Sequence, residues 1–159
     1  MVAITRFTRK AKSERGAELI EFALVFPLLL LVVLGIVDFG FLFQRLEVVT
    51  NAAREGARLA VLPGYDTADV RARVCDYVLN GGVPVSGTCG ATASNPTVLV
   101  EDHNIPVAAG GTVSGKRVTV TFSHNYMFIG GVASWFGGTF TSVPVRSVAI
   151  MRDEVPTSP

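Results

Sequence analysis

Two carboxylates lie at the ends of the longest uncharged apolar stretch of the sequence. Glu21 stands directly before a run of apolar residues from Phe22 to Val37, and Asp38 ends that run. A carboxylate in a low-dielectric setting is costly unless a cation or hydrogen-bond donors compensate it. We therefore expect Glu21 to have a specific partner. For Asp38 two environments are open, the lipid headgroups or a partner on a neighbouring chain.

The two cysteines of the chain, Cys75 and Cys89, are the next residues with chemical potential. In an oxidising compartment they most simply form one disulfide, around a loop of about fifteen residues. A zinc site is poorly supported because no histidine lies near them at ligand spacing.

Residues for catalysis or metal binding form no convincing constellation. The two histidines, His103 and His124, are isolated in the sequence, and Glu101 with Asp102 gives only thin support for a calcium site. The sequence also lacks a nucleophile-elbow serine and a phosphate-binding glycine loop. We expect a protein that is not an enzyme, with no cofactor, no metal and no small-molecule substrate.

The element that must position the carboxylates is predicted to be a membrane-spanning helix. Apolar character resumes after Asp38 and continues to Phe43, so the helix covers roughly 30 Å, the thickness of the hydrocarbon core of a bilayer. No Ala-x-Ala site follows, so the segment does not fit a cleavable secretory signal. The first 16 residues carry five basic residues and one acid. This excess holds the N-terminus in the cytoplasm and places the rest of the chain outside.

The charge of the remaining chain excludes a nucleic-acid partner. The whole sequence has a net charge of +1, and the basic leader accounts for more than this, so that the part after it is mildly acidic. The leader is therefore better explained as a topology signal than as a binding patch. Membrane lipid is the first expected partner.

The helical pattern continues past the membrane, from residue 44 to residue 62, until Pro63 and Gly64 stop it. Small residues recur there at spacings that let another backbone approach closely. They are Ala52, Ala53, Gly56, Ala57 and Ala60. They are expected to pack either against the protein's own sheet or against neighbouring helices in an assembly.

The remainder predicts a small α+β domain. A short helix is expected from the capping candidates at Asp66 to Asn80, followed by a loop to Pro96. Strands are then expected over 97–101, 117–123 and 139–151, and Pro144 should lie at an edge or a bulge. The chain is thus divided into a leader (1–16), a transmembrane helix (17–43), its extension (44–62), an exported domain (63–152) and a flexible tail (153–159).

An aromatic and glycine-rich stretch, 126–138, allows two interpretations. It contains Met127, Phe128, Ile129, Trp135 and Phe136. These side chains are expected either to form core beneath a loop or to form an exposed patch that contacts membrane, partner or surface.

The residues Gly16-Ala17-Glu18-Leu19-Ile20-Glu21-Phe22 resemble the processing site of type IV prepilins. The resemblance implies that a membrane peptidase cuts after Gly16, that Ala17 becomes a methylated N-terminus, and that Glu21 becomes the fifth residue. The freed amine of Ala17, or of a neighbouring subunit, could then neutralise Glu21.

The segments 21–30, Gly35-Ile-Val-Asp-Phe-Gly40 and Asn51-Ala-Ala-Arg-Glu-Gly-Ala-Arg58 closely resemble the TadE-like family, minor pilin-like proteins of the tight-adherence (Flp) pilus. The family pattern leads us to expect an arginine at Phe41, and Arg45 one helical turn later could replace it. The resemblance implies a minor pilin or pseudopilin whose partners are a prepilin peptidase, other pilin subunits and pilus-assembly membrane proteins. The alternatives are an uncleaved scaffold or adaptor of the secretion machine and a membrane-tethered exported binding module.

Overall fold

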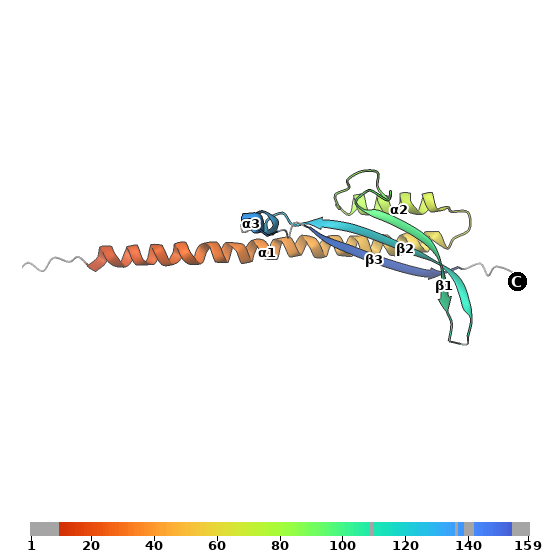
Figure 1. Cartoon of the computed structure of the whole chain (residues 1–159), viewed down its shortest axis with the longest axis horizontal. Coiled ribbons are helices and arrows are strands. Elements are labelled where there is room, and N and C mark those ends of the chain that lie inside the picture. Colours follow the sequence, from red (N-terminus) through yellow and green to blue (C-terminus); the bar gives the residue numbers. More distant parts are fainter. Residues whose placement is uncertain (1–9, 109, 136, 139–141, 154–159) are drawn as a thin grey trace, which may run out of the picture.

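The computed structural model describes residues 10–108, 110–135, 137–138 and 142–153. Figure 1 shows a long helix with a smaller helix and a sheet gathered on its C-terminal half and a short helix beside its middle. The helices are α1 (Lys10–Ala60), α2 (Thr67–Asn80) and α3 (Ile129–Trp135), and the strands are β1 (Thr97–Pro106), β2 (Thr112–Asn125) and β3 (Ser142–Arg152). The predicted α+β class is confirmed, with its long N-terminal helix, short second helix and three-stranded antiparallel sheet.

Helix α1 is continuous through Pro27 and combines two different surfaces. Residues 17–33 of this helix are exposed, whereas its C-terminal half contributes Val49 and several alanines to the core of the domain. The helix ends at Ala60, and the turn that follows contains Pro63 and Gly64, the latter with a positive φ of 91° that favours glycine. It begins at Lys10, inside the expected leader; residues 1–9 lie outside the described part of the chain.

Helix α2 begins with a capping box, in which Asp66, one of the capping candidates of the sequence, is the N-cap residue. The Asp66 carboxylate accepts hydrogen bonds from the N–H groups of Ala68 (2.7 Å) and Asp69 (2.9 Å), and the Asp69 carboxylate accepts from the Asp66 N–H at 3.0 Å. The bonds from Asp69 and Ala68 lower the pKa of the Asp66 carboxyl. Val70 and Val74 on the opposite side of α2 are buried.

The sheet is an antiparallel meander in the order β1-β2-β3. Its central strand places Val118, Val120 and Phe122 in the core that it shares with α1 and α2. Pro144 is exposed in the edge strand β3, as predicted, and an edge strand is where a sheet tolerates a residue without an N–H.

Strands β1 and β2 are longer than expected. They form a hairpin that pairs from Thr97↔Thr121 out to Pro106↔Thr112 and extends away from α1 (Figure 1). The outer part of β1 is largely exposed and rich in polar residues, so it lacks the apolar alternation from which strands were predicted.

The stretch 126–138 contains a helix that was not predicted, α3. Phe136 lies outside the described residues, as do 139–141, the start of the expected last strand. Of the expected flexible tail only Asp153 is described, and its N–H donates to the Ser114 carbonyl at 3.1 Å.

Candidate functional site

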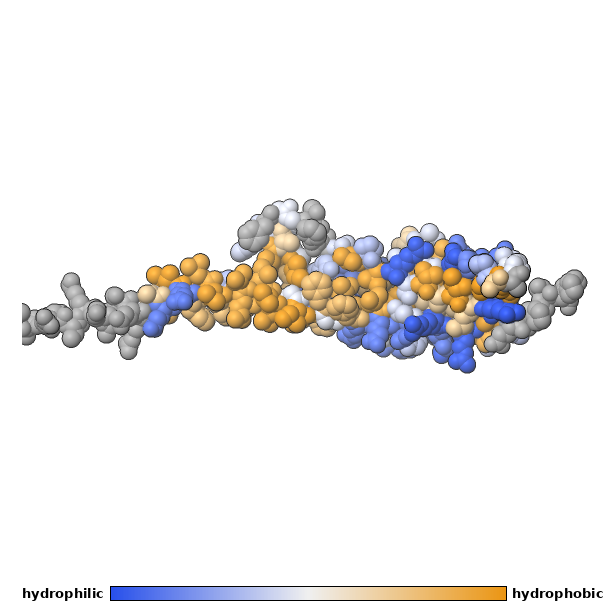
Figure 2. Space-filling view, turned by 90° about the horizontal axis from the view of Figure 1, so that it is seen from below, coloured by the Kyte–Doolittle hydropathy of each residue, from blue (hydrophilic) through white to orange (hydrophobic). Residues whose placement is uncertain are grey.

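The exposed apolar half of α1 is the most prominent surface of the molecule. Within the described residues, one helix is long and apolar enough to cross a membrane, and its most apolar window is not buried in the protein. Figure 2 shows apolar residues along this half of the helix, while the hydrophilic residues gather over the C-terminal domain. This arrangement is consistent with a single-pass membrane anchor.

The residues of the predicted processing site lie at the start of this surface. Ala17, Glu21 and Phe22 are exposed, and Phe22 stacks on Phe26 with 5.2 Å between ring centroids. A Cβ added at Gly16 would meet no atom within 4 Å. Packing within this chain therefore does not require glycine at position 16. Helix stability does not favour it either, because glycine is a poor helix former.

Asp38 has a partner within its own chain. Its carboxylate accepts hydrogen bonds from the backbone N–H groups of Met127 (3.2 Å), Phe128 (2.9 Å) and Ile129 (2.7 Å), and its residue is only 1% exposed. It thereby caps α3 and joins that helix to α1. The two environments expected for Asp38, headgroups and a neighbouring chain, did not include this contact.

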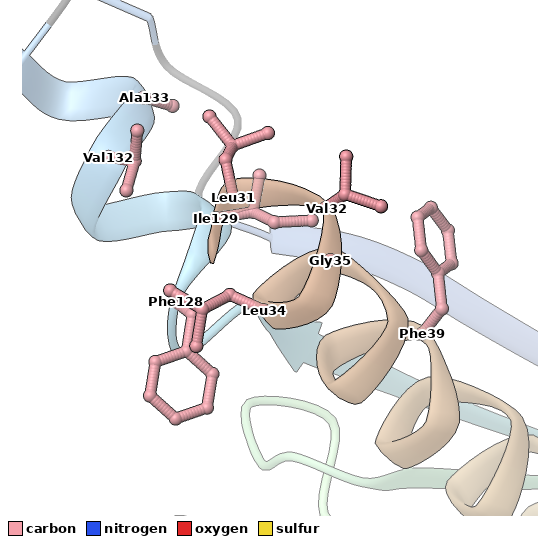
Figure 3. Close-up of a pocket in the computed structure, with 9 residues that line it drawn as sticks. All are labelled: Leu31, Val32, Leu34, Gly35, Phe39, Phe128, Ile129, Val132 and Ala133. Carbon is pink, nitrogen blue, oxygen red and sulfur yellow. The ribbon is translucent and has the colours of Figure 1, made fainter. Parts of the chain in front are cut away.

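An apolar cleft lies between α1 and α3, next to the Asp38 contact. It has a volume of about 410 Å³ and is lined by apolar side chains of both helices together with Gly35. Figure 3 shows Leu31 and Val32 of α1 close to Ile129 of α3, with Phe39 at the other end. α3 therefore rests on the exposed apolar part of α1, away from the core of the C-terminal domain.

The face of small residues on α1 is covered inside the chain. This face comprises Ala52, Ala53, Gly56, Ala57 and Ala60. The first four are buried and the last is half-buried. A Cβ added at Gly56 would come within 2.5 Å of Val74 Cγ2 on α2 and 3.3 Å of Val118 Cγ1 on β2. Contact with a neighbouring helix, the other expectation for these residues, would require this face to be uncovered.

Arg45 and His124 form a second link between α1 and the sheet. Arg45 Nη1 lies 2.8 Å from His124 Nδ1, and the guanidinium carbon lies 6.0 Å from the centre of the Phe122 ring. Because arginine can only donate, Nδ1 is the acceptor and Nε2 carries the proton. The predicted replacement of the family arginine by Arg45 stays a prediction, but Arg45 has a defined structural partner.

His124 should make stability depend on pH. Burial lowers its pKa, Arg45 lowers it further, and Asp38 acts in the opposite direction. The unfolded chain therefore binds the proton more readily than the folded one, so the free energy of unfolding should fall as pH decreases from about 7 to 5. Equilibrium unfolding of the full chain in detergent micelles at a series of pH values measures this.

The matched variants for this prediction are His124→Gln and His103→Gln. Glutamine at 124 can accept from Arg45 but does not titrate, so this variant should lose the decline in stability between pH 7 and 5. His103, whose Nδ1 lies 2.8 Å from Arg117 Nη2, is the control. The His103→Gln variant should retain the decline in stability between pH 7 and 5. The same slope in all three proteins would contradict the role assigned to His124.

Replacing Asp38 by leucine should release α3. These partly buried N–H groups would lose a charged acceptor, and a hydrogen bond to a charged group contributes about 1.5–3 kcal/mol, so hydrogen exchange at Met127, Phe128 and Ile129 should accelerate by about tenfold or more. Asp66→Ala, which removes the carboxylate cap of α2, is the control and should leave exchange at these three amides unchanged. Slow exchange retained in the Asp38 variant would show that the carboxylate does not hold α3.

The predicted disulfide is present. Cys75 and Cys89 are joined, and the bridge ties α2 to the loop that precedes β1. The two residues are 14 positions apart, and Cys75 packs in the core.

The described residues contain no group of three or more His, Cys, Asp or Glu side chains that could hold a metal ion. Lys116 pairs with Asp102, one of the two residues considered for calcium.

The comparisons with known proteins give one match. The model of the TadE-like protein family matches residues 16–58, which are most of α1 including Gly16, Glu21, Asp38 and Gly56. The resemblance stated from the sequence is thus confirmed over this segment. No match to the chain was found among curated proteins or solved structures.

Proposed function

Because the matched segment, residues 16–58, associates the chain with the TadE-like proteins of the Tad pilus, we propose that it is a minor pilin or pseudopilin-like subunit. In this proposal α1 spans the cytoplasmic membrane with its N-terminus inside and holds the C-terminal domain outside. The subunit serves the assembly of a tight-adherence pilus, together with other pilin subunits and pilus-assembly membrane proteins. Its role is structural.

The observation that carries this proposal is the combination of Gly16 and Glu21 at the start of the apolar helix. Cutting after Gly16 places a new amine four residues before Glu21, which is about one helical turn. That amine, on the same or a neighbouring subunit, supplies the cation that a carboxylate at the hydrocarbon boundary needs. The absence of any packing constraint at Gly16 also favours a role in recognition by a prepilin peptidase.

The test is the intact mass and N-terminal sequence of the protein isolated from its native membrane. We expect the wild-type chain to start at Ala17, with a methylated amine, and a Gly16→Ser variant to retain its leader. The matched control is Gly40→Ser, at another glycine of α1 where an added Cβ meets nothing within 4 Å. This control should be cut normally.

A wild-type chain that retains residues 1–16 would contradict the proposed cleavage after Gly16. The uncleaved scaffold or adaptor of the secretion machine would then be the better account, since the anchor and the C-terminal domain would remain as described.

A further inference from the structure

We infer that α3 is embedded beside α1 in the outer leaflet of the bilayer, where Trp135 contacts lipid acyl chains. The inference rests on the proposed membrane span of α1. In this inference α3 makes a second contact with lipid, besides that of α1. The two helices are far apart in the sequence but are joined by the hydrogen bonds from Phe128 and Ile129 to Asp38. The occupant of the surface is phospholipid.

The level of α3 along α1 is the first argument. A hydrocarbon core of about 30 Å that begins at Phe22 ends near Phe41, because a helix rises about 1.5 Å per residue. The cleft that α3 forms with α1 includes Leu31 and Gly35. Gly35 is six residues before Phe41, which places it about 9 Å inside the boundary. Figure 1 shows α3 beside this part of α1, apart from the sheet.

The composition around α3 is the second argument. No Asp, Glu, Lys or Arg occurs between Arg117 and Arg146, whereas α2 alone carries two acids and two arginines. The Trp135 side chain is 90% exposed and Met127 is 68% exposed. Met127 lies at the Asp38 contact with α1, and Trp135 follows the cleft residues Val132 and Ala133 in the same short helix. An aromatic ring left bare at that position gains free energy by entering lipid, and tryptophan favours the membrane interface.

The hydrogen bonding of α3 is the third argument. Backbone groups inside a bilayer must be satisfied by the protein, because no water is present to bind them. The Asp38 carboxylate accepts hydrogen bonds from three backbone N–H groups at the start of α3. At the end of α3 the Gly138 N–H donates to the Ala133 carbonyl at 2.8 Å. The Ser134 hydroxyl is also satisfied, since it donates to the Gly131 carbonyl at 2.7 Å.

The cleft between α1 and α3 favours lipid as the occupant. Its lining is apolar and includes Leu31 and Val32, exposed residues of α1 that the proposed span places in the hydrocarbon (Figure 3). Lipid therefore already surrounds its mouth, and an acyl chain can fill its volume of about 410 Å³. A second copy of the chain would first have to displace that lipid.

Trp135 is the only tryptophan of the sequence, so the native full chain carries its own probe. The protein is reconstituted in phosphatidylcholine–phosphatidylglycerol vesicles at high lipid excess. Its fluorescence is then measured with lipids brominated on the acyl chain and, separately, with aqueous acrylamide. We expect strong quenching by the brominated lipid and protection from acrylamide.

Two reporters in a Trp135→Phe background calibrate the measurement. Leu29→Trp places the probe on the exposed span, and Tyr65→Trp places it on the exposed connection between α1 and α2. Trp135 should resemble the Leu29→Trp reporter. It should be quenched by acrylamide several-fold less than the Tyr65→Trp reporter.

The outcomes separate this inference from the proposed span. Quenching of Leu29→Trp by brominated lipid, with Trp135 quenched only by acrylamide, would overturn the embedding of α3 and leave the anchor intact. Failure of lipid quenching at both positions would overturn the span itself. Protection of Trp135 from both quenchers would show that protein covers it and would also overturn the inference.

Discussion

Replacing Gly56 by leucine should destabilise the folded C-terminal domain by about 3 kcal/mol, at the upper end of the range for overpacked cores. Even the first added carbon would come within 2.5 Å of Val74 Cγ2, a short branched side chain that is itself buried and cannot swing away. Pulse proteolysis of the full chain across a urea gradient in detergent micelles measures the free energy of unfolding.

The control for Gly56 is Gly40→Leu in the same helix, where an added Cβ meets nothing within 4 Å. That change should alter the stability of the domain by less than about 0.5 kcal/mol. A Gly56→Leu protein that folds with wild-type stability but fails to assemble would contradict the packing described above. It would instead support the other expectation for these small residues, that they contact neighbouring helices in an assembly.

Removing the disulfide should cost about 3 kcal/mol, because the unfolded chain regains the freedom that closure of a loop of this length had removed. The double variant Cys75→Ala/Cys89→Ala should therefore unfold at lower urea than the wild type. Alanine at 75 also leaves a small gap in the core, where the sulfur packs.

Reduction of the wild-type protein separates these two effects. The reduced wild type keeps both sulfur atoms, so its loss of stability reports the cross-link alone, and the variant should be equally or slightly less stable. Unchanged stability after complete reduction would show that the bridge contributes nothing to the fold.

The sequence predicted the elements whose patterns are local and strong. The apolar run fixed the position of α1, the Asp66 cap and the glycines after Asn80 bounded α2, and the alternation around Val118 to Phe122 marked the central strand. In each of these segments a periodic apolar pattern coincides with a burial pattern that the fold requires. Cys75 and Cys89 could be paired because the chain has only two cysteines.

Helix α3 could not be predicted from the same signals. It has only seven residues, includes two glycines, and owes its start to a carboxylate that is distant in the sequence. Neither propensity nor periodicity reports such a long-range cap. The available hint was compositional, namely the uncharged stretch between Arg117 and Arg146 combined with an unexplained Asp38.

The environment of His124 was missed for a related reason. In the sequence it stands beside Ser123 and Asn125 near the end of a strand, which is an unremarkable position. It becomes buried because the strand crosses α1 at Arg45, 79 residues earlier in the chain. Pairing at that separation depends on how the sheet packs on the helix, which local sequence patterns do not specify.

The continuity of α1 has a mechanical consequence. The helix that is exposed at Phe22 is the same helix that carries Val49 and Ala53 into the core, and it is continuous between these positions, through Pro27. A force applied to the C-terminal domain is therefore transmitted to the N-terminal end through the covalent backbone and the hydrogen bonds of a single helix. In the proposed subunit, lifting the domain and withdrawing the helix from the membrane would therefore be one movement.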